Sequence, residues 1–267
     1  MQRIKPKKSL GQNFLHDKNI ARKIVNHFDP RENDTVLEIG PGTGALTELL
    51  AGRCKKLYLV EKDKRAIEFL DQRYGDDDTI RIIKSDILDI SIPELATEDG
   101  KLRVIGNIPY YITSPILFHI LDQRRYVYDL MMLMQLEVAR RITSHPSSTD
   151  YGILSVLTQT WATPAFLFKV PATVFYPKPS VDSALVHIVF NRERNEIADE
   201  NRYRSVVRGT FGTRRKMLRS TLKRLYPELP LHQDHFSIDL NKRPEECSVD
   251  DFIQLTNEID HGIKRRR

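Results

Sequence analysis

Short apolar runs alternate with helix-spaced segments along the first two thirds of the chain, and this alternation limits the possible folds more than any other feature. The apolar runs of buried-strand length are residues 34–40, 56–61, 80–86, 102–107 and 128–135. Between them lie segments with apolar residues at helical spacing, such as 43–53 and 64–74. Strands that alternate with helices form βαβ units, in which helices cover both faces of the sheet. The sequence therefore predicts an α/β fold with a twisted, mostly parallel, Rossmann-like sheet.

The composition changes after the apolar run at 184–190. The next segment, "NRERNEIADEN", is highly charged and typical of a linker, and the rest of the chain has helical periodicity only. The sequence therefore predicts two domains, with the sheet in residues 1–191 and a small all-helical domain in residues 192–267.

The sequence favours a cytoplasmic protein. It has no run of about 18 apolar residues, which a membrane span needs, and its basic N-terminus lacks the apolar region of a secretory signal. Cys54 and Cys247 are the only cysteines and are not part of a metal-ligand pattern. We expect a reducing compartment, no bound metal and no membrane partner.

A glycine-rich loop, "EIGPGTGALT", follows the first apolar run. Gly40 and Gly42 allow a tight turn and a close approach of the backbone to a ligand. The helical segment after them presents free N–H groups and a positive dipole end to an anionic group. Gly40, Gly42 and Ala45 also fit the dinucleotide pattern G-x-G-x-x-G/A. The loop therefore predicts either a nicotinamide dinucleotide or an adenosyl cofactor.

Two carboxylates end the next two apolar runs. Ligands of open parallel sheets bind at the carboxyl ends of the strands, so both residues belong to the predicted site. Glu61 could accept hydrogen bonds from both ribose hydroxyls, although a surface location is the alternative. Asp86 could accept from an adenine amine, although an Asp after a strand is also a common helix N-cap.

The fourth apolar run ends in "NIPYY", which separates the two cofactor hypotheses. The exocyclic N6 of adenine is a poor nucleophile because its lone pair is delocalised into the ring. The side-chain carbonyl of Asn107 and the main-chain carbonyl of Pro109 could orient this nitrogen and stabilise its developing charge. Tyr110 could then stack on the base. The motif favours methylation of a base amine over hydride transfer; the alternative is a rigid turn with aromatic residues packed on the core.

Basic residues concentrate in residues 201–227, which contain no acidic residue, within a chain of net charge +6. The basic residues of this segment are Arg202, Arg204, Arg208, Arg214, Arg215, Lys216, Arg219, Lys223 and Arg224. The N-terminus adds a basic arm of Arg3, Lys5, Lys7 and Lys8. One such run is usually a solvated face, but two favour a polyanionic partner such as RNA.

Several motifs together resemble the KsgA-type ribosomal RNA adenine N6,N6-dimethyltransferases, which use S-adenosyl-L-methionine. The similar segments, which extend over nearly the whole chain, are "LGQNFL" at 10–15, "EIGPGTGALT", "NIPY", "VFYPKPSVDSALV" at 174–186, "RRKMLRSTL" and "RPEECSVDDF". The resemblance implies a class I methyltransferase domain followed by a helical domain that binds RNA or the ribosome. The chain departs from the family's usual residues at Tyr111 and Ile153, away from the groups expected to transfer methyl.

The resemblance also implies roles for particular residues. Expected at the cofactor are Gln12, Asn13, Leu15, Gly40, Gly42, Glu61, Lys62, Asp86, Ile87 and Asn107, of which the first three would close the site. Asn107 and Pro109 would hold the target N6, and Tyr110 and Phe175 would sandwich the base. Expected at the RNA are Arg208, Arg214, Arg215, Lys216, Arg219 and Lys223.

The predicted activity is dimethylation of N6 on two adjacent adenosines near the 3′ end of small-subunit ribosomal RNA. The expected partner is a pre-ribosomal small subunit, bound by a monomeric enzyme. Three alternatives stay open: a large-subunit rRNA dimethyltransferase, a non-catalytic RNA-binding or assembly factor, and a nicotinamide-dependent oxidoreductase. The C-terminal motifs count against the first, the intact "NIPY" against the second, and the lack of a Tyr-x-x-x-Lys or similar catalytic arrangement against the third.

Overall fold

The computed structural model describes residues 4–7, 10–96 and 101–264, so Arg3 and Lys8 of the predicted basic arm lie outside the described residues. The chain forms two compact units. The first comprises Met1–Ala139 and Pro164–Phe190, and the second comprises Arg140–Thr163 and Asn191–Arg267. This division differs from the predicted one, because 140–163 joins the C-terminal helices and not the sheet.

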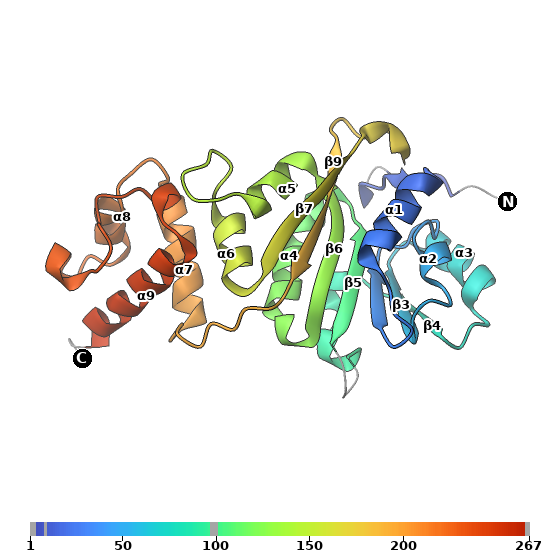
Figure 1. Ribbon diagram of the computed structural model, residues 1–267, viewed down its shortest axis with the longest axis horizontal. Coiled ribbons are helices and arrows are strands. Elements are labelled where there is room, and N and C mark those ends of the chain that lie inside the picture. The colour runs from blue at the N-terminus through green and yellow to red at the C-terminus, as the bar shows by residue number, and fades with distance from the viewer. Residues whose placement is uncertain (1–3, 8–9, 97–100, 265–267) are drawn as a thin grey trace. The chain divides into compact units, whose positions relative to one another are not determined.

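A seven-stranded sheet forms the centre of the first unit, in the order β4-β3-β2-β5-β6-β9-β7 (Figure 1). Its strands are β2 (Thr35–Ile39), β3 (Lys56–Glu61), β4 (Ile80–Lys84), β5 (Leu102–Asn107), β6 (Val127–Gln135), β7 (Thr163–Val170) and β9 (Ser183–Val189). The strands from β4 to β6 are parallel to their neighbours, and β9 is antiparallel to β6. The strand order reverses at β2, which pairs with β3 on one side and β5 on the other. Such a reversal opens a crevice at the carboxyl ends of these strands, where ligands of open sheets bind.

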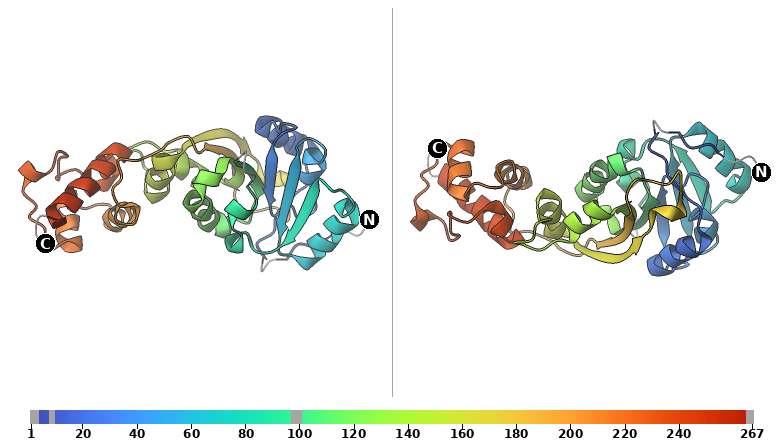
Figure 2. Two further views of the ribbon diagram at one scale, coloured as in Figure 1. Left: turned by 90° about the horizontal axis from the view of Figure 1, so that it is seen from below. Right: turned by 90° about the horizontal axis from the view of Figure 1, so that it is seen from above.

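Helices cover both faces of this sheet (Figures 1 and 2). They are α1 (Lys18–Phe28), α2 (Thr47–Leu50), α3 (Lys64–Tyr74) and α4 (Thr113–Asp122). The next helix, α5 (Leu136–Thr143), spans the boundary between the two units, which lies between Ala139 and Arg140. The residues of β6 alternate between the faces: Met131 and Leu133 belong to the core under α1, α2 and α3, while Met132 and Met134 are equally buried on the other face. Burial on both faces explains why the strands read as continuous apolar runs.

Two short strands bring the N-terminal segment to the sheet. β1 (Phe14–Leu15) pairs antiparallel with β8 (Phe175–Tyr176), so Leu15 lies opposite Phe175. Asp17 then caps α1 by accepting the N–H groups of Asn19 and Ile20. Short 3₁₀ turns of this unit occur at Ile87–Asp89, Ile92–Glu94, Tyr110–Ile112, Arg124–Tyr126 and Ala172–Val174.

The second unit consists of helices and turns among its described residues. These are α6 (Ile153–Trp161), α7 (Glu200–Phe211), α8 (Leu218–Leu225) and α9 (Val249–Lys264), with 3₁₀ turns at Gln233–His235 and Pro244–Glu246. Trp161 meets the buried ring of Tyr203 edge-on, and the hydroxyls of Tyr203 and Thr160 are hydrogen-bonded at 2.8 Å. These contacts join α6 to α7 and explain why residues 140–163 belong to this unit.

The predicted strands of the parallel sheet are confirmed to within two residues at their ends. The predicted helix at 43–53 is much shorter, because the backbone at Gly44 has a positive φ of 77° and the α-helix begins only at Thr47. The sequence pattern does not predict the edge strand β7, whose apolar run "AFLF" is only four residues long and is partly or fully exposed. Among the described residues, no helix is long and apolar enough to cross a bilayer, and no three metal-binding side chains gather at one point.

Candidate active site

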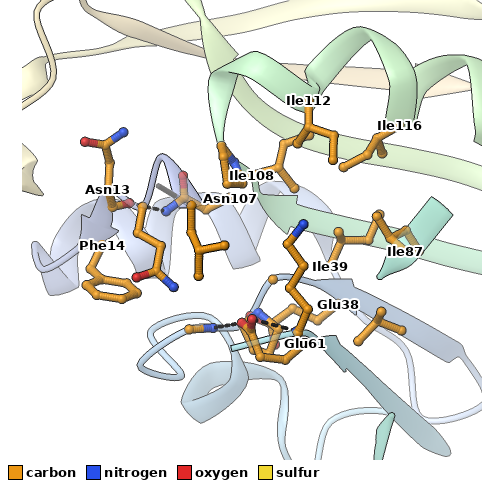
Figure 3. A pocket seen from close by; sticks show the side chains of 18 of the residues that line it. Asn13, Phe14, Glu38, Ile39, Glu61, Ile87, Asn107, Ile108, Ile112 and Ile116 are labelled. Atoms are coloured by element: carbon orange, nitrogen blue, oxygen red, sulfur yellow. Dashed lines mark hydrogen bonds between the residues drawn. The ribbon is translucent and has the colours of Figure 1, made fainter. Parts of the chain in front are cut away.

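A pocket of about 880 Å³, including its open mouth, lies at the carboxyl ends of β2, β3, β4 and β5. Every predicted cofactor-binding residue lines it, together with Pro109. In Figure 3, Asn13 and Phe14 border one side of this pocket, and Ile87, Ile112 and Ile116 border the other. The fold thus brings together residues from the N-terminus, the glycine loop and the ends of successive strands.

The glycine loop needs glycine for two reasons at Gly42. Its φ of 55° lies in the left-handed region, which other residues rarely adopt. In addition, a Cβ at this position would lie 2.8 Å from the ring of Phe14. The backbone N–H of Gly42 donates to the carboxylate of Glu61 at 3.1 Å, so the loop is tied directly to the end of β3.

Glu61 is held in place by three backbone N–H groups. Besides Gly42, the N–H groups of Lys62 and Asp63 donate to its Oε1 at 2.8 and 2.9 Å. Burial raises the pKa of Glu61, and the three N–H donors oppose this rise. The carboxyl group is therefore fixed at the pocket wall as an acceptor (Figure 3).

Asp86 has both of the features that were proposed for it as alternatives. Its Oδ1 accepts the N–H of Leu88 at 3.1 Å, so it caps the 3₁₀ turn, and it also lines the pocket. Its Oδ2 accepts Lys62 Nζ at 2.8 Å. Burial raises the pKa of Asp86, but the hydrogen bonds from Lys62 and from the Leu88 N–H, together with the positive charge of Lys62, outweigh it and the net shift is downward. Asp86 is thus an ionised acceptor at neutral pH.

Asn107 is oriented by the N-terminal segment. Its Nδ2 donates to the main-chain carbonyl of Asn13 at 3.0 Å. Since the amide is planar, this bond turns Oδ1 in another direction, and no described residue donates to that oxygen. The carbonyl of Pro109 accepts the N–H of Ile112 at 3.2 Å, which leaves it a second lone pair. Two carbonyl acceptors therefore lie at the end of β5, as the "NIPYY" motif predicts.

The structure does not bring the two predicted stacking residues to this pocket. The Tyr110 hydroxyl is hydrogen-bonded to Ser183 Oγ at 2.6 Å. Phe175 is 3% exposed, because the pairing of β8 with β1 buries its ring in the core. The aromatic residue that does line the pocket is Tyr111, which is 59% exposed. A base sandwich by Tyr110 and Phe175 stays a prediction that requires Phe175 to move.

Residues 10–15, which we call the strap, cover the pocket. Leu10, Gln12, Asn13, Phe14 and Leu15 all line it. At Gly11 a Cβ would lie 2.9 Å from the ring of Tyr111, so the two residues are in close contact. The strap therefore contacts both the glycine loop, through Phe14, and the segment after β5.

Comparison with known proteins decides the family. The sequence matches the family described as ribosomal RNA adenine dimethylase over residues 3–261. The chain belongs to this family. A relative from Chlorobium phaeobacteroides (strain BS1), described as ribosomal RNA small subunit methyltransferase A, is 48% identical over 256 residues, which cover 96% of this chain and 94% of that protein. The predicted family resemblance is thereby confirmed.

Solved structures support the same fold. A dimethyladenosine transferase from Plasmodium falciparum has a TM-score of 0.79 at 22% identity, with 93% of this chain and 98% of that chain covered. The 23S rRNA methyltransferase ErmE has a TM-score of 0.68 at 28% identity, with 93% and 100% covered. The predicted class I methyltransferase fold is confirmed for this adenine dimethylase.

One carboxyl group that lines the pocket, that of Glu38, is not among the site residues that the sequence predicts. Glu38, at the end of β2, is 2% exposed and lines the pocket, and Thr47 Oγ1 donates to its Oε2 at 2.7 Å. Burial raises the pKa of Glu38 to about 8, with a smaller contribution from the neighbouring Glu61, while the Thr47 hydrogen bond opposes the rise. The signal was present: a charged residue within an otherwise apolar strand, directly before the glycine loop.

The basic residues expected at the RNA differ in their surroundings. Arg215 and Lys216 are exposed just before α8, and Lys223 is exposed in the last turn of this helix. Arg214, in contrast, forms an ion pair with Glu245 and donates to the carbonyl of Thr149 at 2.8 Å. Its guanidinium therefore connects three segments of the second unit. Arg208 is exposed and interacts with other residues of the chain, and Arg219 donates to the carbonyl of Leu231 at 3.2 Å.

Proposed function

We propose that this dimethylase transfers two methyl groups from S-adenosyl-L-methionine to N6 of each of two adjacent adenosines near the 3′ end of small-subunit ribosomal RNA. The observation that carries the proposal is the pair of carbonyl acceptors of Asn107 and Pro109 at the end of β5, in one pocket with Glu61 and Asp86. The 48% identity to a small subunit methyltransferase favours the small-subunit RNA as substrate. We further propose a cytoplasmic monomer that acts on a pre-ribosomal small subunit.

The pocket residues fit the proposed cofactor. Glu61 is fixed as an acceptor for the ribose hydroxyls, and the ionised Asp86 can accept the adenine amine once Lys62 gives way. The glycine loop lets the backbone approach the ligand closely. When bound, S-adenosyl-L-methionine supplies an electrophilic methyl group on a positively charged sulfur. The apolar side chains of Ile39, Ile108 and Ile112 line the same pocket.

The chain's contribution to catalysis is the orientation of N6. Asn107 Oδ1 and the Pro109 carbonyl accept its two hydrogens, which directs the nitrogen lone pair out of the ring plane and stabilises the positive charge that develops on N6. A monomethylated N6 keeps one hydrogen for one acceptor, so the same pair supports the second transfer. Preorganised acceptors act electrostatically. The methylated N6 is positively charged and strongly acidic, so it releases its surplus proton to water and a strong general base is not required.

The test is methyl transfer to isolated particles. The protein and its Asn107→Ala variant are incubated with S-adenosyl-L-methionine and small subunits that lack the modification, and nucleosides of the digested RNA are quantified by mass spectrometry. We expect N6,N6-dimethyladenosine only with the unchanged protein. Large subunits serve as the control substrate, since ErmE is described as a 23S rRNA methyltransferase. Binding without methylation would contradict the proposal and indicate an assembly factor.

A further inference from the structure

Asp63 is a buried carboxylate beside the pocket that the proposed reaction does not use. Its side chain is fully buried and lies between the strap and the start of α3. Gln12 Nε2 donates to its Oδ2 at 2.9 Å, and Arg65 Nε donates to its Oδ1 at 3.1 Å. Lys7 Nζ lies 3.9 Å from the same carboxylate. Asp63 is therefore the anchor to which the strap is attached.

Asp63 is ionised at neutral pH. The hydrogen bonds from Arg65 lower its pKa most, burial opposes them, and the bond from Gln12 lowers the pKa further, to about 2. The hydrogen bond that Gln12 makes is therefore charge-assisted, and such bonds are roughly twice as strong as neutral ones. Arg65 also donates to the main-chain carbonyl of Lys5 at 2.6 Å, so the same ion pair holds the chain before the strap.

The strap connects this anchor to the proposed methyl acceptor site. Gln12 is followed by Asn13, whose main-chain carbonyl accepts Asn107 Nδ2. A displaced strap would remove that acceptor, and the Asn107 amide would be free to rotate. The backbone N–H of Asp63 also donates to Glu61 Oε1, so one residue contributes to the placement of both the ribose acceptor and the strap.

We propose that Asp63 is a positioning residue: through Gln12 it holds the strap closed, and the closed strap directs Asn107 Oδ1 at the substrate nitrogen. This inference rests on the proposed function. It predicts that loss of the Gln12 contact slows methyl transfer even when the cofactor is saturating, because the defect lies in the orientation of Asn107. A contact that only stabilised the fold would change the melting temperature and leave that rate unchanged.

The test uses the full chain with Gln12→Ala, Asp63→Asn and the double variant. Gln12→Ala is the primary variant, because it leaves the ion pair between Asp63 and Arg65 intact. Asp71→Asn is the matched control, since it removes the same charge from an exposed position of α3. Single-turnover methylation of unmodified small subunits is measured at saturating S-adenosyl-L-methionine. We expect a rate about tenfold lower for Gln12→Ala, as for loss of a hydrogen bond to a charged group, and a wild-type rate for Asp71→Asn.

Non-additivity is the second readout. If Gln12 and Asp63 act through one contact, the double variant is no slower than the slower single variant. Single-variant rates within twofold of wild type, or fully additive losses, would overturn the inference. If the unchanged protein does not methylate, the proposed function fails. Backbone hydrogen exchange of residues 10–15 then tests separately whether the contact between Gln12 and Asp63 holds the strap closed. Faster exchange in Gln12→Ala supports it, and unchanged exchange refutes it.

Discussion

Two carboxyl groups, those of Glu38 and Glu61, line one pocket but differ in how strongly their hydrogen-bond partners favour the ionised form. Glu61 accepts three backbone N–H groups, which favour the ionised form and oppose the effect of burial, whereas Glu38 is 2% exposed and accepts the hydroxyl of Thr47. The pKa of Glu38 of about 8 makes it mainly protonated at pH 7. The pocket therefore carries less negative charge at pH 7 than it would if all of its carboxyl groups were ionised.

Replacement of Glu61 by Gln should weaken cofactor binding by about tenfold or more, because a neutral amide accepts the ribose hydroxyls less strongly than a carboxylate. The side chain keeps its size, but its NH2 group must face at least one of the backbone N–H groups that the carboxylate accepts, so the melting temperature of the free protein should also fall. Isothermal titration with S-adenosyl-L-methionine measures the Kd. An affinity equal to wild type would contradict the ribose role of Glu61.

Glu38 should make stability fall as pH rises. Its pKa in the folded protein, about 8, exceeds the ordinary value of 4.5, so the folded state holds this proton more tightly than the unfolded state. The resulting stabilisation is complete below pH 4.5 and is lost as pH rises through 8. It amounts to up to a few kcal/mol, since one pKa unit corresponds to about 1.4 kcal/mol. Denaturant unfolding between pH 5 and 8.5 measures the free energy of unfolding, which should fall more steeply with rising pH in the wild type than in Glu38→Gln, because the glutamine side chain does not titrate.

At the scale of elements, the site depends on the loops between the strands. The glycine loop delays the start of α2 to Thr47, and the space that this frees is occupied by Phe14 of β1. β1 in turn is held by β8, which follows it by more than 150 residues in the chain. β1 and β8 form a two-stranded sheet of their own, so closure of the pocket depends on a segment far away in the chain.

Replacement of Gly42 by Ala should impair both stability and cofactor binding. The new Cβ would clash with the Phe14 ring at 2.8 Å, and a φ of 55° strains any L-residue by about 1 to 2 kcal/mol. Gly52→Ala is the matched control, since Gly52 has a φ of 72° but no atom within 4 Å of the added Cβ. Both variants should lose similar stability to backbone strain, and only Gly42→Ala should raise the Kd for the cofactor. Equal Kd values would show that Phe14 accommodates the methyl group without moving the strap.

At the scale of the whole molecule, the basic residues of the second unit fall into two groups: some form ion pairs within the unit, and others are exposed. Ion pairs such as Arg214 with Glu245 and Arg202 with Asp260 hold segments of the second unit together. Exposed residues such as Arg215 and Lys216 contribute the positive surface that an RNA partner requires. The same run of basic residues therefore forms ion pairs within the second unit and also contains the residues that are predicted to contact RNA.

The combined variant Arg215→Ala, Lys216→Ala and Lys223→Ala should weaken binding to small subunits at low salt. Each lost phosphate contact reduces the slope of log K against log salt by up to about one. Arg214→Ala is the contrasting variant, because removal of one partner of its ion pair should lower the melting temperature of the protein. Filter binding at several salt concentrations measures the slope. An unchanged slope in the triple variant would mean that these residues form a solvated face only.

The sequence by itself determined the order of strands and helices, the two-part organisation and the motifs at the strand ends. These features are local: apolar periodicity sets the type of an element, and parallel strands place their carboxyl ends at one edge. Only the tertiary structure decided that Asn13 orients Asn107, that Asp63 anchors Gln12, that Phe175 is buried and that residues 140–163 join the second unit. Each of these depends on contacts between residues far apart in the chain, and such contacts are set by strand register and side-chain packing, which no local pattern encodes.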